Sequence, residues 1–219
     1  MSAFPGSPRV LMGGLVLLDP DSTAVQRVVV LQYNPETVTR SLQPQAIGPE
    51  SGDRLEALRL KGAPVETIKL DAELDAADQL EHPDQNPAAV QLGLHPQLAA
   101  LETIVYPHSS DVQTNLDLAS IGTIEIAPTD ASLTVFVFSR SRVVPVRLTE
   151  FSITEEAFDP SLNPIRAKVS LGMRVLNVND FGVGVAGTSL FMAYHRQREQ
   201  LASMVQTSSL APLGITRVI

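Results

Sequence analysis

A strict two-residue alternation over residues 165–175 constrains this chain more than any other feature of its sequence. One side of the segment is apolar throughout: Ile165, Ala167, Val169, Leu171, Met173 and Val175. The other side carries three cations, Arg166, Lys168 and Arg174. Side chains of a β-strand point alternately to its two faces, so this pattern predicts a long strand with one buried and one solvated face. We expect the three cations to be exposed or to pair with acids on a neighbouring surface.

Other segments also predict strands, and together they indicate a mainly β fold with some helix. Residues 10–18 and 26–33 are apolar runs separated by a turn-forming segment, which predicts a hairpin. Residues 68–75 alternate between apolar and charged positions. Residues 133–138 have no polar face, which predicts burial on both sides.

The segment 144–153 predicts an irregular strand. Its apolar positions are Val144, Val146 and Leu148, followed by Phe151 and Ile153, so the phase slips by one residue near Glu150. Such a slip indicates a β-bulge, which bends a strand. A bent strand suits a barrel better than a flat sheet.

Helical patterns are fewer. Residues 96–105 begin with a proline and continue with leucines at helical spacing, and residues 188–205 carry a longer apolar stripe. We expect residues 44–63 and 106–120 to be loops, because both are polar and contain proline. The predicted organisation is a β domain over residues 1–186, followed by a C-terminal helix and tail.

Composition excludes several classes of function. The chain has 219 residues, 44% of them hydrophobic, and contains no cysteine, which excludes thiol catalysis, disulfides and cysteine zinc sites. A net charge of −8 disfavours nucleic acid as a partner. No signal peptide is recognised and no stretch reaches the roughly 20 apolar residues of a membrane span. The low charged fraction, 18%, is a hint that other subunits cover part of the surface.

One motif suggests a nucleotide site. Residues 182–187 match G-x-G-x-x-G between a predicted strand and a predicted helix, the context of a dinucleotide-binding turn. The motif lies near the C-terminus, however, and no acid follows about 20 residues on. A glycine linker between strand and helix is the plainer interpretation.

No other residues form a recognisable catalytic or metal-binding pattern. The four histidines, His82, His95, His108 and His195, include no pair at metal-ligand spacing. Glu155 and Glu156 are adjacent, and adjacent side chains of an extended segment point to opposite faces. We therefore expect no enzyme activity, catalytic residue, metal or cofactor.

Four segments taken together resemble a known family. They begin at Tyr33 (YNPETVTRSLQPQ), Pro64 (PVETIKLDAELD), Leu94 (LHPQLAALE) and Ile153 (ITEEAFDPSLNPIRAKVSL). Their order and spacing resemble the tube-protein domain of contractile injection systems, the phage-tail-like particles of bacteria, over roughly residues 10–180. The string around Phe158, Phe-Asp-Pro-x-Leu-Asn-Pro-x-Arg-Ala, is its most specific part.

The resemblance implies an assembly protein with a phage tail-tube-like fold, an antiparallel β-barrel or sandwich with a flanking helix. Six copies would close into a ring of the inner tube, or into a baseplate adaptor between the spike-hub and the tube. Many members of this branch carry a C-terminal LysM module, which we do not expect here, because only a predicted helix and a short segment follow Tyr194 in this sequence. The implied partners are further copies of the chain and tube, spike-hub and other baseplate proteins, without nucleic acid or direct membrane insertion. The implied location is the bacterial cytoplasm during assembly, and then a particle that is released or membrane-attached.

Two turns and three cations are candidate subunit contacts. The turns supply Asn34, Pro35 and Glu36, and then Phe158, Asp159, Asn163 and Pro164. The cations are Arg166, Lys168 and Arg174, which could meet the charged face of residues 69–75 within the fold or across a ring interface. Arginine outnumbers lysine 13 to three, as is common at protein interfaces. The alternatives are a nucleotide-dependent enzyme using residues 182–187 and a monomeric β-sandwich module that binds a small ligand.

Overall fold

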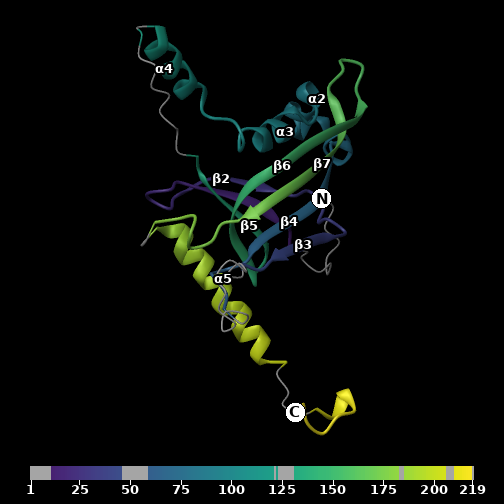
Figure 1. Ribbon diagram of the computed structural model, residues 1–219. Coiled ribbons are helices and arrows are strands. Elements are labelled where there is room, and N and C mark those ends of the chain that lie inside the picture. The colour runs from purple at the N-terminus through teal and green to yellow at the C-terminus, as the bar shows by residue number, and fades with distance from the viewer. Residues whose placement is uncertain are drawn as a thin grey trace.

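The computed structural model describes residues 11–45, 59–120, 122, 131–182, 185–205 and 210–218. Its described strands form one antiparallel sheet in the order β2-β1-β5-β6-β7-β4-β3 (Figure 1). The strands are β1 Gly14–Leu18, β2 Val25–Val30, β3 Val38–Gln43, β4 Val65–Asp75, β5 Leu133–Ser139, β6 Arg142–Phe158 and β7 Pro164–Val175. The fold is therefore mainly β, as predicted.

The helices lie beside the sheet or project from it. Those that follow β4 are α1 Ala77–Leu80, the 3₁₀ turn η2 Pro83–Gln85, α2 Pro87–Leu92, α3 His95–Glu102 and α4 Ser109–Ser120. Those that follow β7 are α5 Ala186–Ser203 and the 3₁₀ turn η3 Ala211–Leu213. Figure 1 shows α2 and α3 behind the upper part of the sheet, whereas α4 and the end of α5 stand away from it. The predicted flanking and C-terminal helices are thus confirmed.

The predicted strand alternation is confirmed in β4 and β7. In β7, Ala167, Val169, Leu171, Met173 and Val175 are buried. The two strands pair in register, so that the buried residues of β4 lie opposite those of β7. The hairpin of β1 and β2 and the burial at the start of β5 also agree with the sequence patterns.

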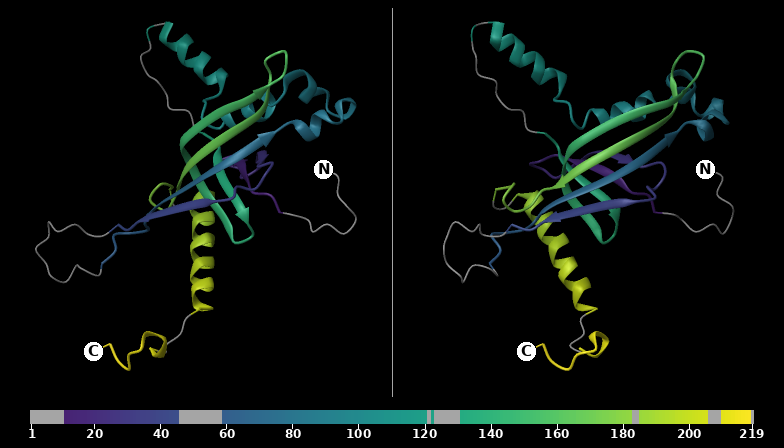
Figure 2. Two further views of the ribbon diagram at one scale, coloured as in Figure 1. Left: turned by 90° about the vertical axis from the view of Figure 1, so that its right-hand side faces the viewer. Right: turned by 45° about the vertical axis from the view of Figure 1, so that its right-hand side comes forward.

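The predicted bulge lies where the phase of the sequence slips. The register of β6 against β7 shifts between Leu148 and Glu150, so Thr149 has no partner in the ladder. Its hydroxyl donates instead to the carbonyl oxygen of Gly172, at 3.2 Å. Beyond the bulge, β6 crosses the molecule at a steep angle to β1 and β2 (Figures 1 and 2).

The bend rolls the sheet around one core. The core joins residues of β1, β4, β5, β6 and β7 with residues of α3 and α5. Gln32, just after β2, closes part of the seam between the two ends of the rolled sheet. Its side-chain amide donates to the carbonyl oxygen of Asp75 at 2.6 Å and accepts from the amide of Asp75 at 2.9 Å. One side chain thus makes the pair of bonds that a strand residue would make.

One expectation needs correction. The prediction of a loop over residues 106–120 is wrong for its larger part, because residues 109–120 form α4. The short helices α1 and α2 and the strand β3 also lie where the sequence patterns predicted no regular element. Of the loop predicted over residues 44–63, residues 46–58 lie outside the described part of the chain.

Candidate subunit-contact surface

The turn between β6 and β7 is fixed by hydrogen bonds to one carboxylate. Asp159 Oδ1 accepts from the backbone amides of Ser161 and Asn163 at 2.7 and 2.8 Å, and its Oδ2 accepts from Asn163 Nδ2 at 2.8 Å. The pKa of Asp159 lies below its ordinary value, because the side chain and backbone amide of Asn163 and the backbone amide of Ser161 donate to its carboxylate. Leu162 adopts a φ of 67°, a conformation that the surrounding bonds must maintain.

The same turn is docked on α2 and α3. Asn163 Nδ2 donates to the carbonyl oxygen of Gln91 at 3.1 Å, and the amide of Leu94 donates to the carbonyl oxygen of Pro164 at 2.8 Å. Gly93 has a φ of 57°, and a Cβ there would lie 2.4 Å from the Pro164 oxygen. Phe158 and Leu162 remain 49% and 77% exposed. The turn therefore presents two apolar side chains on a rigid support.

The other predicted turn has a different role. Asn34 Oδ1 accepts from the amide of Gly13 at 2.9 Å, and Asn34 Nδ2 donates to the carbonyl oxygen of Leu11 at 2.8 Å. Asn34 thus ties the segment after β2 to the segment before β1. Pro35 is half-buried and Glu36 is exposed. The structure does not bring these three residues together with the β6–β7 turn.

The three candidate cations lie on the solvated face of β7 and pair within the chain. Arg166 contacts Asp75 at 2.8 Å, Lys168 contacts Glu156 at 3.2 Å, and Arg174 contacts Asp180 at 2.8 Å. The hydrogen bond to Asp75 and its charge raise the pKa of Arg166. Of the two arrangements left open by the sequence, pairing with residues 69–75 inside the fold is the one observed for Arg166.

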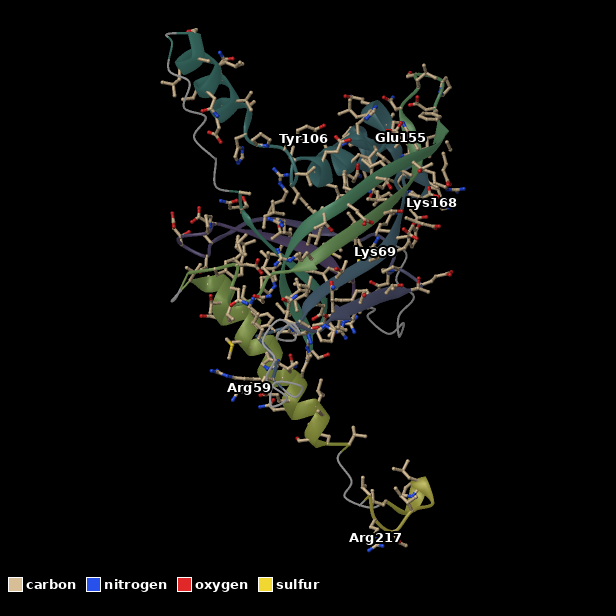
Figure 3. All side chains as sticks on the ribbon, in the orientation of Figure 1. Arg59, Lys69, Tyr106, Glu155, Lys168 and Arg217 are labelled. Carbon is tan, nitrogen blue, oxygen red and sulfur yellow. The ribbon has the colours of Figure 1, made fainter. Side chains whose placement is uncertain are left out.

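An ion pair crosses this face at a glycine. Lys69 on β4, Gly172 on β7 and Glu150 on β6 lie in register. Because Gly172 has no side chain, Lys69 Nζ reaches Glu150 across β7 at 2.6 Å. Figure 3 shows Lys69 and Lys168 on the front of the sheet. The strands of this face carry five acids and five bases: Asp71, Glu73, Asp75, Glu150, Glu156, Lys69, Arg147, Arg166, Lys168 and Arg174. Asp180, just beyond β7, pairs with Arg174 and adds a sixth acid.

This polar face ends in two open strand edges. Among the described strands β3 pairs with β4 alone, so no described strand covers its outer edge. At the opposite end of the polar face, β5 pairs with residues 142–146 of β6. The remaining, longer part of β6 pairs with β7 alone among the described strands, so its other edge is open. A groove of about 540 Å³ follows this edge, between Phe151 and Ile153 of β6 and Val105 and Tyr106. Sequence reasoning missed both edges, because pairing partners are a property of the folded sheet.

The described residues support a metal or nucleotide site less than they support a contact surface. The described residues contain no group of three or more histidines, aspartates and glutamates placed to hold a metal ion. Residues 183 and 184 of the glycine motif lie outside the described part. Packing offers another reason for Gly187, because a Cβ there would lie 2.3 Å from the ring of Phe181 unless that ring moved. No helix of the described chain has the length and apolar character to cross a membrane.

Comparison with known proteins adds no relative. No protein-family model matches this chain, and no curated protein matches it significantly. We therefore infer a function from the residues, their geometry and the resemblance described above.

Proposed function

We propose that this chain is a structural subunit of a contractile injection system that forms a hexameric ring of the inner tube or baseplate. The observation that carries the proposal is the pair of open edges at either end of the polar sheet β3-β4-β7-β6. A contact between two different edges is head-to-tail, and repeated by rotation it closes a ring. An unprotected edge is otherwise an aggregation hazard that folded proteins cover.

Strand direction supports this contact. Each neighbouring pair among β3, β4, β7 and β6 is antiparallel, so β6 runs opposite to β3. When copies are related by rotation about an axis parallel to the strands, each strand runs in the same direction in every copy. The β6 edge of one copy therefore meets the β3 edge of the next as an antiparallel pair, and the sheet continues around the ring.

The two edges also match in polarity. On β3, Val38 and Leu42 lie on the core side, opposite Leu70 and Glu66 of β4. On β6, Phe151 and Ile153 lie on the core side, opposite buried residues of β7. Leu42 is 46% exposed in the single chain. Arg40 also lies on the core side of β3, between Val38 and Leu42, where Glu66 meets its charge. Joining the edges would place Val38 and Leu42 beside the apolar side chains of β6 and leave the polar face continuous.

The polar face would then line the channel. It is occupied by charged and hydroxyl side chains and by Gly172, a composition that favours contact with water or with a polar cargo. The particle, its spike-hub and tube partners, and assembly in the bacterial cytoplasm belong to the same proposal. The proposal includes both possible positions of the ring, in the inner tube and as the baseplate adaptor.

Electron microscopy of the purified full chain tests the ring. We expect closed rings of six copies, and we expect Leu42→Asp to abolish them because it places a charge in the apolar side of the joined edges. Val25→Asp is the matched control, since Val25 is 63% exposed on β2, away from the proposed contact. Circular dichroism of both variants separates loss of assembly from loss of folding.

A chain that stays monomeric at all concentrations and never enters sheathed particles would overturn the proposal. One observation would then favour a small-ligand module: an apolar cavity of about 430 Å³ lined by residues that include Ile104, Leu133, Leu176 and Phe181. Mass photometry distinguishes the two functions, because the module remains a monomer.

A further inference from the structure

Glu155 is an exposed carboxylate on the core side of the open β6 edge. It lies opposite Ala167 of β7, which is fully buried, so it continues the core-side row of Phe151 and Ile153 along this edge. Figure 3 shows Glu155 toward the upper end of β6. Its neighbour Glu156 pairs with a lysine of the polar face, whereas Glu155 forms no ion pair with any described residue.

The open edge of β3 carries a cation on the same side of the sheet. Arg40 lies opposite the buried Ile68 of β4. Arg40 and Arg198 of α5 both pair with Glu66, and no other carboxylate of the described residues forms an ion pair with either guanidinium. Two cations therefore share one anion, and the cluster keeps one positive charge.

Part of this charge can be reached from the β3 edge. The side chain of Glu66 is 3% exposed, whereas that of Arg40 is 28% exposed. Arg40 donates to Glu66 through Nε and Nη2, and to the Tyr194 hydroxyl through Nη2. None of the described residues accepts a hydrogen bond from its Nη1. Arg40 therefore has a donor left for a second acceptor.

Only a few registers of the joined edges keep the core side continuous. Side chains alternate between the two faces of a strand, so these registers differ in steps of two residues. Arg40 of one copy can then oppose a core-side residue of the other edge, which is Phe151, Ile153 or Glu155. The first two registers place the guanidinium against an apolar side chain. The third places it against a carboxylate.

We propose that Glu155 of one copy pairs with Arg40 of the next and that this ion pair sets the register of the joined edges. The inference rests on the proposed ring and adds to it the alignment of the two strands. The same register places Ile153 opposite Leu42, so that apolar side chains meet. Glu155 also supplies the negative charge that the cluster around Glu66 lacks. Complementary charges of this kind fix register and partner more than they raise affinity.

The polar face agrees with this register. β6 pairs with β7 without irregularity over residues 150–155, so this stretch has a defined alternation. With Glu155 opposite Arg40, Thr154 lies opposite Ser41 and Ser152 lies opposite Gln43. All four of these polar side chains are exposed in the single chain. Cross-strand pairs of hydroxyl side chains favour a sheet, and no like charges meet among these positions.

Single cysteines on the polar face test the register, because the natural chain has none. We would mix full-length Ser41→Cys with full-length Thr154→Cys, one of them carrying a size tag, oxidise the mixture and measure the mixed disulfide on a non-reducing gel. Ser152→Cys replaces Thr154→Cys in the control and reports the register shifted by two residues. Directly opposite side chains lie closer than diagonal ones, and a disulfide needs close Cβ atoms, so we expect the first pair to exceed the control about tenfold.

Two adjacent glutamates provide a matched test of the ion pair. We expect rings of Glu155→Gln to dissociate at about tenfold higher protein concentration than rings of the natural chain, because Arg40 loses its second carboxylate. Glu156→Gln makes the same change on the polar face and should leave this concentration unchanged. Mass photometry of a dilution series measures both variants.

The outcomes separate this inference from the ring itself. A mixed disulfide specific to Ser41→Cys with Thr154→Cys, together with weaker rings for Glu155→Gln alone, supports the ion pair. Rings in which the control pair yields as much disulfide, or in which both glutamine variants behave alike, overturn the ion pair and leave the ring. Chains that form neither rings nor a specific disulfide overturn both.

Discussion

At the scale of single residues, Gly172 explains how the polar face is organised. It lies between Lys69 and Glu150 in the register of three strands, and its missing side chain lets the ion pair cross β7. Both partners are exposed, so the ion pair itself adds little stability. The constraint is steric, because a Cβ on Gly172 would lie 2.8 Å from the Cβ of Glu150.

We therefore expect Gly172→Ala to lower the free energy of unfolding by roughly 1–3 kcal/mol, the usual cost of overpacking. Urea denaturation measures the loss. The matched experiment repeats the substitution in a Glu150→Gly background, where the opposing Cβ is gone and most of the loss should disappear. Equal losses in the two backgrounds would contradict the steric explanation.

Asp159 makes the β6–β7 turn sensitive to acid. Hydrogen bonds from Asn163 lower the pKa of Asp159 in the folded chain. A lowered pKa means that the carboxylate stabilises the fold above its unfolded pKa and that this contribution is lost as the pH falls through the folded pKa. The order of the turn should therefore persist at neutral pH and disappear only in acid.

Asn163→Ala should raise the midpoint of this transition toward the ordinary pKa of aspartate, because it removes a side-chain donor to Asp159. Two-dimensional NMR of the backbone amides at the turn measures the midpoint. Ser161→Ala keeps its backbone amide donor and should leave the midpoint unchanged. An unchanged midpoint in Asn163→Ala would contradict the assigned cause.

At the scale of elements, α5 is fastened by a buried carboxylate. Glu66 lies on the core face of β4, where it accepts from Arg40 Nε at 2.8 Å, from the Tyr194 hydroxyl at 3.2 Å and from Arg198. Burial, followed by the charge of Glu66, raises the pKa of Tyr194, so the phenol stays protonated and donates. Phe191 and Tyr194 are buried, whereas Met204, just beyond the helix, is 78% exposed.

Glu66→Ala should cost about 3 kcal/mol of stability and loosen α5, because it leaves two partly buried guanidinium groups without their acid. Urea denaturation gives the cost, and limited proteolysis detects release of the helix. Glu199→Ala is the control: its carboxylate lies on the same helix, is 66% exposed and, among the described residues, forms an ion pair with His195 alone. Equal effects of the two variants would show that the cluster does not hold α5.

The elements also show where sequence patterns fail. The proline and the polar residues of the segment before β5 favoured a loop over residues 106–120, yet α4 forms there. Its apolar positions are few and none of its residues is buried by the described part of the chain, so the signal that identifies a core-facing helix is weak. A helix that stands away from the core is harder to recognise in the sequence than one that packs on it.

At the scale of the whole molecule, charge is distributed unevenly. The net charge of −8 raised the question of whether acids would line a channel. On the polar face of β4, β7 and β6, acids and bases balance, so the excess negative charge lies elsewhere. A ring built on this face would present a polar surface of nearly zero net charge to its cargo, and we expect weak electrostatic selection there.

The sequence by itself determined the strand faces, the bulge and the two main packed helices. These follow from local periodicity, because the alternation of β7 and the phase slip near Glu150 record which side chains must be buried. Only the tertiary structure decided which strand edges stay open, that Glu66 faces the core, and that Lys69 meets Glu150 across Gly172. Those relations join residues far apart in the chain, and no local pattern encodes a distance between them.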